Sequence, residues 1–151
     1  MQEWAFSITK AMNIDHIQDL INATTSLSSA IGMRFISTPE PDTIMGQLDV
    51  DERTRQPFGV LSGGATLALA ETLAGLGSMV LCPGEHFVGI NVSGSHVKAV
   101  FEGDTITALA RVVHHGRRFH VWNVEVTNTA GEVISTVNVT NYAVTIKPRE
   151  A

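Results

Sequence analysis

The sequence predicts an α+β domain in which one curved antiparallel sheet wraps around a single long helix. The stretch from Gly64 to Cys82 is almost wholly apolar, and Glu71 is the only acidic or basic side chain between Pro57 and Gly84. Most of the chain after this stretch has the alternating pattern of strands. A helix that is apolar on all sides must be surrounded by protein, and only a curved sheet is large enough to surround it.

The overall composition fits one globular domain over residues 1–151, without internal repeats. A net charge of −5 argues against a general nucleic-acid binder, whose footprint would be basic. Residues 64–82 are about long enough to span a membrane, but the central glutamate and the many small residues favour a helix buried in protein on all sides. Since no secretion signal opens the chain, we expect a cytoplasmic protein without a membrane partner.

The single cysteine, Cys82, excludes an intrachain disulfide and a cysteine-based zinc cluster. At the C-terminal end of an apolar helix it is expected to act as a small hydrophobic residue. His114, His115 and His120 are not expected to bind a metal, because no cysteine or carboxylate accompanies them at ligand spacing.

The first half of the chain predicts a helical segment and two strands before the long helix. Apolar residues at three-and-four spacing indicate a helix within residues 13–31, and the Thr and Ser residues within 24–29 favour a break into two shorter helices. Short strands are expected at 33–37 and 43–50. A polar loop at 51–59 then leads to the helix.

The second half predicts four strands in an antiparallel run, at 86–97, 104–115, 119–128 and 133–146. Thr129 to Glu132 reads as a hairpin turn. In the third of these strands, His120, Trp122, Val124 and Val126 are each two positions apart and therefore share one face. Residues 147–151 are expected to form a frayed tail. This order of elements is that of a hotdog fold.

Four segments carry a resemblance to a known family. They are RQPFGVLSGG at 55–64, LAET at 69–72, VGINVSGSH at 88–96 and HHGR at 114–117. Together they resemble the hotdog-fold acyl-CoA thioesterases, and within these the PaaI-like branch of the Arthrobacter-type 4-hydroxybenzoyl-CoA and the 1,4-dihydroxy-2-naphthoyl-CoA thioesterases. The resemblance extends from about residue 14 to residue 146.

The resemblance implies a catalytic site without a metal or redox cofactor, with coenzyme A as part of the substrate. Glu71 is implied as the catalytic carboxylate, acting as nucleophile or as general base on water. Gln56 is implied to place the nucleophile and the substrate, and Gly63 to offer its backbone N–H to the thioester carbonyl. Such sites are shared between subunits, which implies a homodimer at least and a homotetramer as the expected assembly.

Two positions depart from the family pattern. The family usually has His where this chain has Ser62, and Ser or Thr one helical turn after the glutamate, where this chain has Gly75. Ser62 is expected to retain a hydrogen bond to the carbonyl or to water, and Thr72 is a nearby hydroxyl. These departures leave a second function open, that of a non-catalytic or weakly active acyl-CoA-binding protein.

Further residues are implied as binding residues. His96, with Ser95 before it, is expected beside the acyl group, as are Thr72 and Gly75. His115, Gly116 and Arg117 are expected to bind coenzyme A, because a compact basic turn suits its phosphates.

Each of these assignments has a structural alternative. Glu71 could pair with Arg53, Arg55 or a backbone donor, Ser62 could be an ordinary helix N-cap, and the basic turn could be a solvated hairpin.

Overall fold

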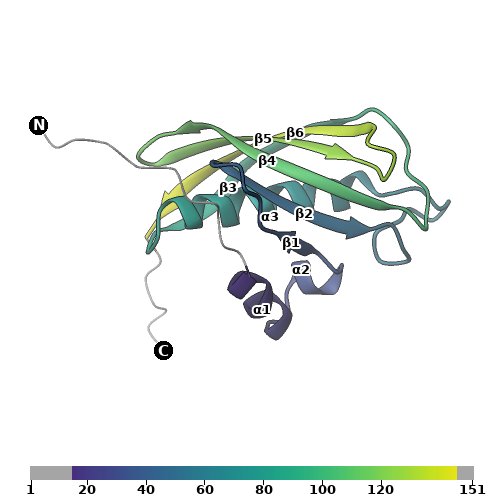
Figure 1. Ribbon diagram of the computed structural model, residues 1–151, viewed down its shortest axis with the longest axis horizontal. Coiled ribbons are helices and arrows are strands. Elements are labelled where there is room, and N and C mark those ends of the chain that lie inside the picture. The colour runs from purple at the N-terminus through teal and green to yellow at the C-terminus, as the bar shows by residue number, and fades with distance from the viewer. Residues whose placement is uncertain (1–14, 146–151) are drawn as a thin grey trace, which may run out of the picture.

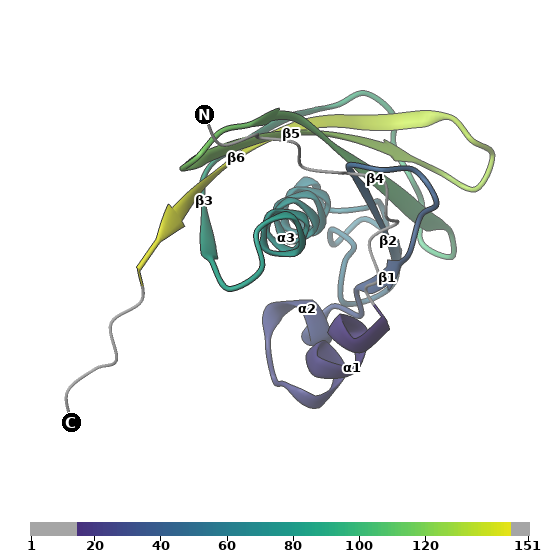
Figure 2. The same ribbon diagram turned by 60° about the vertical axis from the view of Figure 1, so that its left-hand side comes forward.

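The computed structural model describes residues 15–145, which form a six-stranded antiparallel sheet curved around one long helix (Figures 1 and 2). The strand order across the sheet is β1-β2-β4-β5-β6-β3. The helices are α1 (Asp15–Ala23), α2 (Leu27–Ala30) and α3 (Gly63–Leu81), and the strands are β1 (Arg34–Ile36), β2 (Thr43–Asp49), β3 (His86–His96), β4 (Thr105–His115), β5 (Phe119–Thr127) and β6 (Val133–Val144). The predicted hotdog architecture is confirmed.

The element boundaries agree with the sequence pattern to within one or two residues. The predicted break in the first helical segment separates α1 from α2, where Ser26 and Ser29 form a reciprocal capping box. The side-chain oxygen of Gln18 on α1 accepts a hydrogen bond of 2.6 Å from the N–H of Phe35, which ties α1 to β1. The expected tail at 147–151 and the first residues of the 13–31 segment lie outside the described residues.

The last four strands are antiparallel, but they do not pair in the order of the chain. β3 pairs with β6, whereas β4 lies between β2 and β5. β3 is therefore an edge strand eleven residues long, and most of its residues are exposed. Such a long exposed edge offers unpaired backbone N–H and C=O groups to another strand.

The core lies between the concave face of the sheet and one side of α3. His120, Trp122, Val124 and Val126 on β5 are all fully buried, which confirms the alternation read from the sequence. The Trp122 ring lies so close to Gly77 of α3 that a Cβ at that glycine would come within 2.5 Å of it. The absence of a side chain at Gly77 therefore lets α3 approach the sheet.

The expectation that α3 is buried on all sides is wrong for the single chain. The buried residues of α3 lie on the side that faces the sheet; they are Thr66, Leu69, Ala70, Leu73, Ala74, Gly77 and Ser78. Along the other side, residues such as Glu71, Leu76 and Met79 are half-buried or exposed. α3 is long and apolar enough to cross a membrane by length and composition alone. In the folded domain, one side of α3 packs against the concave face of the sheet and forms part of the core.

Candidate functional site

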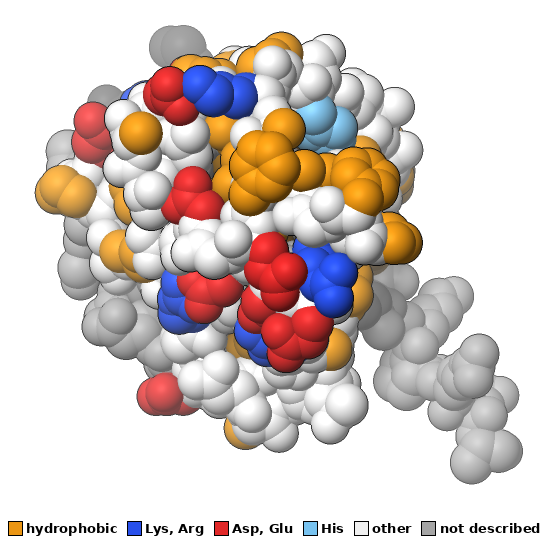
Figure 3. All heavy atoms as spheres, turned by 90° about the vertical axis from the view of Figure 1, so that its right-hand side faces the viewer, with side chains coloured by type: hydrophobic (Ala, Val, Ile, Leu, Met, Phe, Trp, Pro, Cys, Tyr) orange, Lys and Arg blue, Asp and Glu red, His pale blue; other side chains and the backbone are white. Residues whose placement is uncertain are grey.

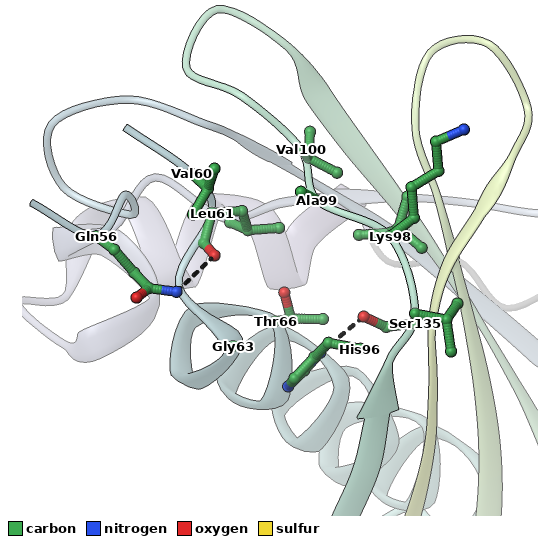
Figure 4. Close-up of a pocket in the computed structure, with 12 residues that line it drawn as sticks. Gln56, Val60, Leu61, Gly63, Thr66, His96, Lys98, Ala99, Val100 and Ser135 are labelled. Atoms are coloured by element: carbon green, nitrogen blue, oxygen red, sulfur yellow. Dashed lines mark hydrogen bonds between the residues drawn. The ribbon is translucent and has the colours of Figure 1, made fainter. Parts of the chain in front are cut away.

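A cleft of about 310 Å³ lies at the N-terminal end of α3 (Figure 4). The loop after β2, the start of α3, the end of β3 and β6 enclose it. The lining residues are Gln56, Val60, Leu61, Gly63, Thr66, His96, Val97, Lys98, Ala99, Val100, Ile134 and Ser135. The structure thus brings together three residues that the sequence singled out, Gln56, Gly63 and His96.

His96 is the side chain held most closely against the start of α3. Its Nε2 lies where a Cβ on Gly63 would come within 2.6 Å, so a glycine at position 63 is required for this approach. Its Nδ1 is 2.8 Å from the hydroxyl of Ser135, the residue paired with His96 across β3 and β6. This hydrogen bond fixes the ring over the first turn of the helix.

The first turn of α3 leaves backbone donors available. Within residues 15–145, no hydrogen-bond acceptor pairs with the N–H of Gly63 or Gly64. Ser62 occupies the N-cap position, but its side chain makes no capping hydrogen bond, so the N-cap alternative for its hydroxyl is wrong. N–H groups at a helix start carry partial positive charge, and they suit a carbonyl oxygen that becomes negative during a reaction.

Gln56 is half-buried in a loop that folds back on itself. Its backbone N–H donates to the carbonyl of Val60 at 2.7 Å, and its side-chain Nε2 lies 3.5 Å from the carbonyl oxygen of Leu61. These contacts direct the amide toward the cleft rather than into solvent (Figure 4). Gln56 can therefore meet a ligand that lies against the start of α3.

Glu71 lies two turns along α3 from the cleft. Among the described residues no side chain forms an ion pair or hydrogen bond with it, and its carboxylate packs against the backbone of Gly89 on β3. The expected alternative pairings are wrong, because Arg53 pairs with Asp51 at 2.6 Å and Arg55 with Glu102 at 3.3 Å. The carboxylate thus has no hydrogen-bond or ion-pair partner within residues 15–145.

The remaining predicted acyl contacts lie outside this cleft. Thr72 and Gly75 are on the half-buried side of α3, and Ser95 is exposed on β3. In the single chain, none of the three lines the space occupied by Gln56, Gly63 and His96.

The predicted coenzyme A segment lies at the opposite end of α3 from the cleft. Arg117 and Arg118 line a shallow pocket of about 230 Å³ together with Glu85. Arg118 donates a hydrogen bond of 3.2 Å to the hydroxyl of Tyr142. His115 is the last residue of β4, and Gly116 follows it, so Arg117 and Arg118 lie next to each other in the short turn between β4 and β5.

The sequence indicated that no cysteine lies near His115 or His120, but the folded chain places Cys82 beside both. The Sγ atom of Cys82 lies 3.5 Å from Nε2 of His115 and 3.9 Å from Nε2 of His120. The sequence argument considered spacing along the chain, whereas α3 and the sheet bring together residues that are 33 and 38 positions apart.

Sequence reasoning missed Thr66 and Ser135. Thr66 is the ordinary second-turn residue of an apolar helix, and Ser135 is one of many hydroxyls on β6. Only the pairing of β3 with β6 puts Ser135 beside His96, and no short-range pattern reports that pairing.

Comparisons with known proteins agree with the fold. A profile of the Thioesterase superfamily matches residues 58–135. The 1,4-dihydroxy-2-naphthoyl-CoA hydrolase of Escherichia coli is 34% identical over 93 residues, which are 61% of this chain and 68% of that protein.

Solved structures show the same fold. A thioesterase from Haemophilus influenzae superposes with a TM-score of 0.83 at 28% identity, over 94% of this chain and 98% of that one. A Streptococcus mutans protein bound to acetyl CoA superposes with a TM-score of 0.68 at 25% identity, over 75% of this chain and 89% of that one.

Proposed function

Because the chain belongs to the Thioesterase superfamily, we propose that it hydrolyses an acyl-CoA thioester at a site shared by two copies of the chain. The observation that carries the proposal is the unpartnered carboxylate of Glu71, on a helix whose first N–H groups also have no acceptor within the described residues. Hydrolysis of a thioester needs a nucleophile or a general base, which a carboxylate can supply, and a donor to the oxyanion that develops.

The separation of Glu71 from Gly63 favours a shared site. The two residues are eight positions apart on α3, which is about 12 Å along a helix that rises 1.5 Å per residue. A single carbonyl group cannot contact both of them within one chain. A second copy, related by a two-fold axis, can place its Glu71 beside the Gly63 of the first.

The edge of the sheet supplies a surface on which two copies could associate. β3 has a free edge, and its Val88 and Ile90 are exposed hydrophobic residues. Pairing of β3 with its symmetry mate would continue the sheet and cover the exposed side of α3. Figure 2 shows that β3 borders the open side of α3.

Either role of Glu71 gives a free acid and coenzyme A. As a nucleophile, its carboxylate oxygen bonds to the thioester carbon, the carbonyl electron pair moves to oxygen beside the Gly63 N–H, and the C–S bond breaks to release the thiolate. Water then cleaves the anhydride and restores Glu71. As a base, Glu71 instead takes a proton from water while the water oxygen bonds to that carbon. The C–S bond then breaks, and the departing thiolate takes the proton from Glu71.

We propose that the reacting group and the coenzyme A phosphates bind at opposite ends of α3. The cleft at Gln56 and His96 would hold the reacting group, and Val97, which lines it, is exposed. On this side of the molecule, hydrophobic side chains gather beside a cluster of acidic and basic ones (Figure 3). Arg117 would bind a coenzyme A phosphate. The neighbour solved with acetyl CoA supports a ligand of this class.

Glu71→Gln tests the catalytic role without changing side-chain size. Thiol release from a panel of aryl- and alkyl-CoA thioesters should fall by about 10²- to 10⁴-fold, which is the usual contribution of a positioned acid–base group. Glu125→Gln, at an exposed position on β5, is the matched control and should match wild type. Unchanged turnover in Glu71→Gln would remove this residue from the mechanism.

A mixing experiment tests the shared site. Gln56→Ala and Glu71→Gln should each be inactive, whereas a mixture whose subunits exchange should recover about a quarter of wild-type activity, since half the dimers are mixed and each has one intact site. If both residues served a site within one subunit, the mixture would stay inactive. Light scattering that showed a folded monomer would also contradict the proposal.

The alternative function is acyl-CoA binding without efficient turnover. It is favoured by Ser62, which stands where the family usually has histidine and whose hydroxyl makes no capping hydrogen bond. Binding across the panel without thiol release would establish it, and a large gain in the rate of thiol release in Ser62→His would show that the serine limits the rate.

The coenzyme A site is tested by inhibition with the product: Arg117→Ala should weaken inhibition by coenzyme A. Arg111→Ala, which removes an exposed arginine paired with Glu40, should not.

A further inference from the structure

Three side chains with metal-ligating atoms meet at the C-terminal end of α3, away from the cleft. Cys82 directly follows the helix, His115 ends β4, and His120 lies at the start of β5. Their ligand atoms all lie within 4.8 Å of one another. We propose that Cys82, His115 and His120 form a binding site for a borderline-soft divalent cation, of which Zn²⁺ is the type, with water as the fourth ligand.

The distances fit a tetrahedral ion with modest adjustment. With Zn–S near 2.3 Å and Zn–N near 2.0–2.1 Å, sulfur and nitrogen ligands lie about 3.6 Å apart. The observed separations from Cys82 Sγ are 3.5 Å to His115 and 3.9 Å to His120. One thiolate and two imidazoles select Zn²⁺ over Mg²⁺ and Ca²⁺, which prefer oxygen ligands.

The packing around His120 holds its ring in a fixed orientation. The imidazole is fully buried, stacks on Phe87 with ring centroids 4.5 Å apart, and meets the ring of His115 edge-on at the same separation. Its Nδ1 is 2.9 Å from the hydroxyl of Ser78 on α3. A metal-ligating histidine usually has its second nitrogen hydrogen bonded in this way, which fixes the ring and its tautomer.

The hydrogen bonds around Ser78 determine the tautomer of His120 in the structure. The Ser78 oxygen also lies 2.9 Å from Nε1 of Trp122 and 3.0 Å from Nδ2 of Asn141, and both of these nitrogens only donate. Ser78 must then donate its own proton to Nδ1 of His120. The ring proton is left on Nε2, which faces Cys82.

A bound cation needs the other tautomer, and the same side chains can hold it. With the proton on Nδ1, His120 donates to Ser78, and the Ser78 hydroxyl then needs an acceptor. Turning the amide of Asn141 presents Oδ1, a buried atom that has no hydrogen-bond partner in the present arrangement. Nε2 of His120 is then free to coordinate. His120 stays neutral overall, and the thiol of Cys82 gives up one proton to solvent.

Cysteine binds a metal ion as the thiolate, so binding of the cation displaces the thiol proton of Cys82, and proton release reports thiolate coordination. The bound ion would tie the end of α3 to the turn between β4 and β5.

The test uses reduced, chelator-treated protein without a histidine tag, titrated calorimetrically with Zn²⁺. Wild type should bind one ion per chain with release of about one proton at pH above neutral. Cys82→Ser and His115→Gln should each weaken binding at least tenfold, whereas His114→Gln, the exposed neighbour on β4, should bind as wild type does. With Co²⁺, wild type should show a thiolate-to-cobalt charge-transfer band that Cys82→Ser lacks.

Two results would overturn the proposal. One is no Zn²⁺ binding by wild type; the other is binding that Cys82→Ser leaves unchanged or that His114→Gln weakens as much as His115→Gln does. The latter pattern would mean that exposed histidines bind the ion without the thiolate. Because both test residues are accessible rather than fully buried, the variants should fold, and a thermal melt of each apo variant confirms it.

Discussion

The carboxylate of Glu71 lies directly against Gly89 of β3. It occupies the space where any other residue at position 89 would place its Cβ. The strand has a register irregularity between Gly89 and Asn91, so Ile90 is an extra residue in the pairing with β6. Irregularities of this kind re-aim side chains beside functional sites. Here the missing side chain leaves room for a carboxylate that nothing else in the described chain holds.

Gly89→Ala should lower turnover by displacing this carboxylate. The added methyl group overlaps Oε1 of Glu71, so the side chain must change its rotamer. A displacement of about 1 Å in a reacting group can cost 10²-fold in rate. Steady-state kinetics should therefore show a fall of about 10- to 100-fold in kcat, with the fold retained.

A double-mutant cycle separates this effect from damage to the strand. In a Glu71→Ala background the overlap is gone, so adding Gly89→Ala should change thermal stability less than it does in wild type. Equal stability losses in both backgrounds would show that the methyl group disturbs β3 and not the carboxylate.

Most of the fold could be predicted because it follows from periodicity. The apolar run of α3 and the alternation of β5 each report burial from neighbouring residues alone. The pairing of β3 with β6 could not be predicted in this way, since it depends on contacts far apart in sequence. The half-covered side of α3 was also missed, because an apolar helix face does not reveal whether its own chain covers it.

In the candidate site, too, some residues stand out in the local sequence, whereas others are brought together only by long-range packing. Gly63 and Glu71 stand out in the sequence because a glycine pair opens a helix that carries one charge, whereas Gln56 stands out only through the resemblance to a known family. Contacts that form only when β6 or the β4–β5 turn packs into place, such as His96 with Ser135, have no local signature.

Ser135→Ala should impair catalysis by releasing His96. The substitution removes the hydroxyl 2.8 Å from Nδ1, and a hydrogen bond of this kind contributes roughly 1 kcal/mol, or about fivefold. We expect kcat/KM to fall by about that factor. Thr136→Ala, at the adjacent exposed position on β6, is the control. Similar losses in both variants would argue against a positioning role for Ser135.

Two glycines of α3 should respond to alanine in opposite ways. Gly77→Ala overlaps the Trp122 ring and should cost about 1–3 kcal/mol of stability through overpacking. Gly75→Ala meets no atom within 4 Å and should raise stability by up to about 1 kcal/mol through helix propensity. Thermal or urea unfolding measures both. A stability gain in Gly77→Ala would mean that the contact between α3 and β5 is looser than the structure shows.

Stability should fall as the pH is lowered from 6.5 to 4, because His120 is buried in its neutral form. Burial, with the nearby His115, lowers the pKa of His120 from 6.5 to about 4. Above pH 6.5 the residue is neutral in both states and contributes no pH dependence. Between 6.5 and 4 the unfolded chain takes up a proton that the folded chain does not, which favours unfolding by roughly 3 kcal/mol at 1.36 kcal/mol per pH unit. The pKa of Asp49 is lowered from 3.8 to about 2 by its hydrogen bonds to Arg34 and Thr105, so Asp49 changes the stability only below about pH 4. Urea unfolding in chelating buffer should therefore give a flatter pH profile for His120→Gln than for wild type, and parallel profiles would contradict the assignment.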